Sequence, residues 1–402
     1  MTRVADSTIK GFLYQFNKTM VEILDSDHDQ EITIEGIIED IDITAIDGTA
    51  TAVQCKYHES VTNYSTSLIY KPLLQMAESY SKDQNKKTKY IIFIHVPTQT
   101  EATRNITPNE IDSALASQDS TYIKLINRIQ QPIDKVLFSN SVQLQFGPSL
   151  DEIEKTAKRK LDELKITAAE TECILYPNAL NRIAKISSFS KETERKLTKL
   201  QFIRFLSGVS NTAVTKWTLA LKNRKEILQT MRSQLQSTLN LNSQNRYFYF
   251  DQNSIDNFSE NIVSFICNFV AMYHCKTSHI KPPLFAINCE KSVLLDLQYR
   301  LYTKGIKSNT GIIGLNFVPA EFYKDPIIKK NKSHVEEREF EIRLLSFIEN
   351  PEALTLKKGT ELFFISNEIP NAVDTSDTNI YLIGANNFYE LEYIMHLRKT
   401  YE

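Results

Sequence analysis

Three polar side chains on two short apolar segments have the types and spacing needed to hydrolyse a phosphodiester. Asp40 lies in the first segment, and Gln54 and Lys56 lie two residues apart in the second. Side chains two apart on a strand point to the same face, so Gln54 and Lys56 share a face while Cys55 points away. If the two segments pair, a carboxylate, an amide oxygen and an ammonium group meet in one small space.

That set of groups suits metal-assisted hydrolysis of a phosphodiester. A carboxylate holds a hard divalent cation such as Mg²⁺ or Mn²⁺, and the cation neutralises phosphate charge and lowers the pKa of a bound water. A neighbouring lysine positions the water or stabilises charge that develops at phosphorus. We therefore expect Asp40, Gln54 and Glu35 as metal ligands. Lys56 is the expected catalytic cation.

The segments that carry these residues have the pattern of paired strands. Residues 31–44 alternate polar and apolar positions, which predicts one strand. Asp47-Gly48 is a turn signal, and residues 51–57 are expected to return as a second strand. Glu35 differs in parity from the catalytic aspartate on that expected strand. It therefore needs a bend or bulge near Gly36 to reach the site.

The order of the motifs resembles one branch of the PD-(D/E)xK nuclease superfamily. Gly11-Phe-Leu-Tyr-Gln15, Glu35-x4-Asp40-Ile-Asp42 and Gln54-Cys-Lys56 follow one another as in the double-stranded DNA endonuclease domain of bacterial anti-phage effectors. The resemblance covers roughly residues 5–100 and implies a restriction-endonuclease-like fold and Mg²⁺-dependent endonuclease activity. It also implies that Gln15 belongs to the catalytic set with Asp40, Gln54 and Lys56 and lies near the metal, on a helix behind the sheet.

Two positions depart from the superfamily pattern. Glu39 precedes Asp40 where proline is typical, and Gln54 replaces the second acid. A neutral amide is a weaker ligand for a hard cation than a carboxylate, and Glu35 or Asp42 would have to compensate.

Within this branch, the sequence resembles the nuclease subunit of Lamassu systems slightly more than the CBASS-associated effector fused to a cyclic-oligonucleotide sensor. The resemblance implies an SMC-type ATPase or other defence-system subunits as partners. The ten glycines form no P-loop, which agrees with an ATPase on a separate chain. An unrestrained nuclease would be toxic, so we expect activation by release from a partner or by homo-oligomerisation.

Two alternative functions remain open at this stage. The first is a nucleotide-sensing nuclease effector whose C-terminal domain binds the ligand. The second is a catalytically inactive interaction protein that keeps the nuclease fold.

Charge is unevenly distributed along the 402 residues, although the net charge is only −2. Residues 1–60 hold twelve acidic and four basic side chains, a balance of −8, whereas residues 155–225 hold sixteen basic and six acidic ones, a balance of +10. A basic surface attracts duplex DNA by counterion release, so we expect part of this segment to contact DNA. Solvated helices or an oligomer interface are the alternatives. The basic residues concerned are Lys155, Lys158, Arg159, Lys160, Arg195, Lys196, Lys199, Arg204, Lys222, Arg224 and Lys225.

The chain length predicts two or three domains. We expect an α/β protein with a mixed-sheet nuclease domain over 1–148 and a helical linker or oligomerisation region over 149–243. A C-terminal α/β domain, regulatory or partner-binding, is expected over 244–402. In that last domain, residues 311–317 are expected to form a strand and residues 335–349 a helix.

Cysteine usage and hydropathy indicate the compartment. The five cysteines are sparse and show no CxxC spacing, which favours a reduced protein without a zinc site or a disulfide framework. The sequence has no apolar run of about 18 residues and no apolar signal core at its start. We therefore expect a cytoplasmic protein that does not associate with a membrane.

Overall fold

The structure, a computed structural model, describes residues 2–36, 39–45, 47–83, 87–130, 132–166, 170–241, 244–277, 279–330 and 336–401, with side chains from residue 7 onward. The chain forms two compact units, Met1–Ser210 and Asn211–Glu402. The expected α/β class, with a mixed sheet near the N-terminus, is confirmed. No helix in the described ranges is both long and apolar enough to cross a membrane.

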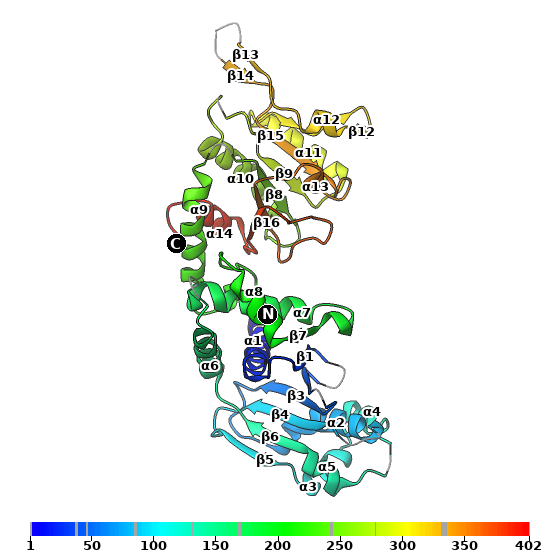
Figure 1. The fold of residues 1–402 in the computed structure, drawn as a ribbon. Coiled ribbons are helices and arrows are strands. Elements are labelled where there is room, and N and C mark those ends of the chain that lie inside the picture. The colour runs from blue at the N-terminus through cyan, green and yellow to red at the C-terminus, as the bar shows by residue number, and fades with distance from the viewer. Residues whose placement is uncertain are drawn as a thin grey trace. The chain divides into compact units, whose positions relative to one another are not determined.

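Unit 1 is built on a seven-stranded mixed sheet (Figure 1). Its strands in spatial order are β5 (Ala102–Asn105), β6 (Val142–Phe146), β4 (Lys89–His95), β3 (Ala50–Tyr57), β2 (Ile41–Thr44), β1 (Glu31–Ile34) and β7 (Lys196–Thr198). The central strands β3, β4 and β6 run parallel, and the remaining neighbours pair antiparallel. β7 lies in a segment where only helices were expected, and it closes the sheet edge beside β1.

Two groups of helices cover this sheet. One group comprises α1 (Thr2–Asp25), α6 (Leu150–Glu163), α7 (Tyr176–Ser187) and α8 (Lys199–Ser207), with α1 packed on β3. The other comprises α2 (Tyr70–Lys82), α3 (Pro108–Leu115), α4 (Ser120–Ile126) and α5 (Lys135–Ser141). Leu13, Phe16 and Met20 of α1 are buried at helical spacing, and full burial of each such side chain contributes roughly 1.5–3 kcal/mol. This packing fixes the sheet against α1.

Residues 31–44 do not form the single strand that their alternation predicts. They form β1 and β2, which pair antiparallel with Ile34 opposite Ile41. The chain reverses after Glu35, which has a φ of 52°, and the Glu35 N–H donates to the Asp40 carbonyl at 2.7 Å. Alternation within each strand could not reveal this reversal, because a left-handed residue breaks the period of two.

Unit 2 contains a six-stranded sheet in which all neighbouring strands run parallel. In spatial order the strands are β10 (Ser308–Asn309), β15 (Ile342–Ser346), β9 (Leu284–Ile287), β8 (Arg246–Phe250), β16 (Glu361–Ile365) and β17 (Asn379–Leu382). Its helices are α9 (Arg224–Leu239), α10 (Phe258–Tyr273), α11 (Lys291–Thr303), α12 (Pro319–Phe322), α13 (Ala353–Leu356) and α14 (Phe388–Ile394). The helices of the 149–243 region therefore divide between the two units, with α9 in unit 2.

Two C-terminal predictions were wrong. Residues 311–317 form the hairpin β11 (Ile312–Ile313) and β12 (Asn316–Phe317) instead of one strand. Residues 335–349, expected as a helix, contain β14 (Glu336–Arg338), which pairs with β13 (Ile328–Lys330), and then β15. All five residues of β15 are buried between β10 and β9, so tertiary packing overrides the helical propensity of this segment.

Candidate active site

Strand pairing in unit 1 brings the Asp40 carboxylate to Gln54. The register places Ile41 opposite Val53, so Asp40 lies opposite Gln54 at the start of β2. The Asp40 Oδ2 atom accepts hydrogen bonds from the Gln54 side-chain amide and from the Cys55 backbone N–H, the latter at 2.9 Å. The first contact that the sequence predicts for this site is therefore present.

Lys56 joins the same face, since it lies two residues after Gln54 on β3. Burial raises the pKa of Asp40 to about 6, and the Lys56 ammonium and the Cys55 N–H partly oppose this effect. Lys56 itself is partly exposed. A cation close enough to act on the aspartate, with access to solvent, can also meet a phosphate group.

Gln15 of α1 and Glu35, which follows β1, also belong to this cluster. The Gln15 amide of α1, which is 8% exposed, donates to the Glu35 Oε1 atom at 2.7 Å. The Glu35 carboxylate raises the pKa of Asp40, which places the two acids near each other. Because β1 and β2 are separate antiparallel strands, Glu35 stands opposite Asp40, and the expected parity conflict does not arise.

The oxygen atoms left over in this cluster have the chemistry of a hard-cation site. Within the described part of the chain, no group donates to Asp40 Oδ1, Glu35 Oε2 or Gln54 Oε1. Carboxylate and amide oxygens are the ligands that Mg²⁺ and Mn²⁺ accept. Over the same ranges there is no cluster of three or more His, Cys, Asp or Glu side chains that could hold a metal. The set here is thus two carboxylates and one amide.

Two more acidic residues, Glu39 and Asp42, flank Asp40 along the chain. Glu39 is 7% exposed, and burial, together with the charge of Asp40, raises its pKa to about 9, although Lys56 opposes the shift. The Glu39 Oε1 atom has no hydrogen-bond partner in the described residues. The acidic residues of Glu39-Asp40-Ile-Asp42 were the available signal, but strict alternation would have turned Glu39 away from the site.

Gly36 packs directly against Asp42. A Cβ atom on Gly36 would lie 2.1 Å from Asp42 Oδ2 and 2.3 Å from its Cγ. Asp42 Oδ1 accepts the Glu39 N–H at 3.2 Å. Glycine at this position therefore lets the turn pack directly against Asp42, which holds the turn by accepting the Glu39 N–H.

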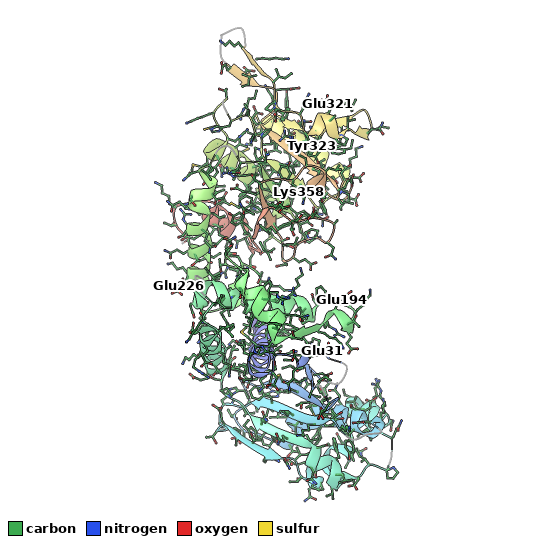
Figure 2. All side chains as sticks on the ribbon, viewed as in Figure 1. Glu31, Glu194, Glu226, Glu321, Tyr323 and Lys358 are labelled. Carbon is green, nitrogen blue, oxygen red and sulfur yellow. The ribbon has the colours of Figure 1, made fainter. Side chains whose placement is uncertain are left out.

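Ion pairs neutralise much of the basic segment. Four basic side chains on α6 pair with acids: Lys155 with Glu152, Lys158 with Glu154 and Glu172, Arg159 with Glu163, and Lys160 with Asp25. Lys196 of β7 pairs with Glu31, labelled in Figure 2, at 2.7 Å. Among described residues, Arg195, Lys199 and Arg204 form no ion pair. The surface available to DNA is thus smaller than the sequence count predicts.

Comparison with known proteins gives little further information. No protein-family model matches the sequence. No curated protein matches it either. Among solved structures, the chain is similar to the Cap4 SAVED/CARF-domain containing receptor of Moraxella osloensis, with 12% identity and a TM-score of 0.25 over 99% of this chain and 94% of that one. A TM-score of 0.25 establishes neither a shared fold nor a shared activity, so we base the function on the residues of this chain.

Proposed function

We propose that this protein is a metal-dependent endonuclease that cleaves double-stranded DNA. The observation that carries the proposal is the cluster in which the Asp40 carboxylate accepts the Gln54 amide on one face with Lys56, while Glu35 lies alongside. Carboxylates gathered in a buried site repel one another, and a bound cation would relieve that repulsion.

Each side chain has a distinct role in this proposal. Asp40, Glu35 and Gln54 would hold Mg²⁺ or Mn²⁺, which neutralises phosphate charge and supplies a water of lowered pKa. Lys56 binds a phosphate oxygen or orients the attacking water through its ammonium group. Gln15 is a positioning residue, because its amide fixes Glu35 Oε1 and leaves Oε2 directed elsewhere.

The biological setting follows from the motif resemblance alone. The order Gly11–Gln15, Glu35–Asp42, Gln54–Lys56 supports an effector of prokaryotic anti-phage defence, held inactive until a partner such as an SMC-type ATPase releases it or the chain oligomerises. Contacts through charge read phosphates rather than bases, so we propose low sequence specificity.

Cleavage of supercoiled plasmid DNA tests the activity. We expect nicking by the wild type with Mg²⁺ or Mn²⁺ and a loss of about 100-fold or more in Lys56→Ala, the effect typical of removing one charge-stabilising group. Lys71→Ala, an exposed lysine on α2, is the matched control and should cleave normally.

A second measurement tests the metal site even if the isolated protein is held inactive and does not cleave DNA. Mn²⁺ binding, followed by calorimetry, should occur in the wild type and in Lys56→Ala, and should be lost in Asp40→Asn. Equal plasmid cleavage by the wild type and Lys56→Ala contradicts the proposal. Absence of both cleavage and Mn²⁺ binding favours the non-enzymatic interaction protein.

A further inference from the structure

Unit 2 contains a cavity of about 200 Å³ that the nuclease proposal does not use. It lies where neighbouring parallel strands end, since Thr310 follows β10, Ser346 closes β15, and Lys291 opens the helix after β9. Parallel sheets place their ligand sites along this carboxyl edge, where loops and helix starts converge. The position of the cavity therefore matches that of a ligand site.

Apart from Ser346, whose hydroxyl donates to the Cys289 carbonyl, the polar side chains around the cavity are not used by the fold. Five of them make no hydrogen bond or ion pair with any residue in the described ranges: Lys291, Thr310, Asn316, Glu349 and Asn350. Polar groups that face a concave site without protein partners are available to a ligand, and a few such groups among apolar walls are typical of small-molecule sites.

The lining specifies the chemistry of that ligand. Lys291 supplies a positive charge, and lysine binds phosphate as a point charge. It is also the first residue of α11, whose N-terminus no side chain caps, so the positive end of the helix lies beside the ammonium. Glu349 accepts hydrogen bonds and thus suits a hydroxyl group, whereas Leu294 and Phe317 provide an apolar wall for a carbon skeleton.

The volume limits the size of the ligand. At about 30 Å³ per water in the liquid, 200 Å³ corresponds to about seven water molecules. That is room for a phosphorylated pentose. We propose that unit 2 binds a small phosphate monoester with several hydroxyl groups, with its phosphate at Lys291 and a hydroxyl at Glu349. The ligand is either a free sugar phosphate or the sugar phosphate of a mononucleotide.

Calorimetry on the full chain tests this site with ribose 5-phosphate as the probe. We expect saturable binding, and a 10- to 100-fold weaker affinity in Lys291→Ala, the effect of losing one hydrogen bond to a charged group. Lys304→Ala, at the other end of α11, is the control and should bind as the wild type does. Glu349→Gln should weaken ribose 5-phosphate and leave inorganic phosphate unaffected.

AMP distinguishes the two sources of the ligand. If AMP binds more tightly than ribose 5-phosphate, the ligand is a mononucleotide. If AMP binds equally well or more weakly, the ligand is a free sugar phosphate. Lys56→Ala should bind the probe normally, so this result does not depend on the nuclease proposal. If neither probe binds at millimolar concentration, or if Lys291→Ala binds ribose 5-phosphate as well as the wild type, the assignment is wrong. Thermal unfolding of each variant confirms that it folds.

Discussion

Substituting Asp40 by asparagine should change how the stability of unit 1 depends on pH. Burial raises the pKa of Asp40 from 3.8 to about 6 in the folded protein. Between these values the folded state keeps a proton that the unfolded state has lost, so stability falls as pH rises through this window. At 1.36 kcal/mol per pH unit, the full effect is up to about 3 kcal/mol.

The variant lacks this titration, so its stability relative to the wild type should rise with pH. About 2 kcal/mol of the change falls between about pH 4.5 and about pH 7. The substitution also removes hydrogen bonds of the carboxylate. Their loss lowers the stability of the variant by the same amount at both pH values, so it cancels from the change with pH. Glu39 keeps its proton across this range, because its pKa is about 9.

The assay is urea denaturation of the wild type and Asp40→Asn across this pH range. Asp47→Asn is the flat control, because the Thr49 N–H lowers the pKa of that exposed carboxyl below its ordinary value. Asp47 is then ionised in both the folded and the unfolded state across this range, so the difference between its variant and the wild type should not change with pH. If the difference in unfolding free energy between Asp40→Asn and the wild type does not change with pH, the argument that burial raises the pKa of Asp40 is refuted.

Three further substitutions test contacts that stabilise the fold. Gly36→Ala should cost about 1–3 kcal/mol, because its Cβ would overlap Asp42, whereas Gly11→Ala has open space around it and should stabilise α1; urea unfolding compares the two. Glu361→Ala should cost about 3–5 kcal/mol, since it leaves the buried Arg246 guanidinium without its 2.7 Å ion-pair partner; a loss below 1 kcal/mol in thermal unfolding would contradict this.

The sequence predicted which side chains lie together better than it predicted the strands that carry them. Gln54 and Lys56 share a face because β3 is a regular strand, where a period of two holds over all eight residues. The partner of Glu35 could not be derived in the same way. Its left-handed φ turns one expected strand into two, and only the pairing of those strands reveals that Glu35 faces Asp40.

Contacts between residues far apart in the sequence explain the other differences between the predicted and the observed elements. β7 has three residues and a register set by β1, which lies more than 160 positions earlier, so no local pattern announces it. β15 lies in a segment that was predicted to be a helix. Its second residue, Arg343, donates to the carbonyls of Phe322 and Pro282, and the whole strand is buried. Contacts of this kind override local propensity.

The position of β7 bears on how the sheet that carries the candidate site is assembled during synthesis. The outer edge of β1 stays open until Lys196–Thr198 has left the ribosome, and the Lys196–Glu31 pair forms equally late, after the Lys160–Asp25 pair can form. A fragment that stops at residue 148 would leave α1 and β1 uncovered, whereas one that continues to Ser210 retains their partners. Unit 1 thus gains its complete scaffold only after about half of the polypeptide has been made.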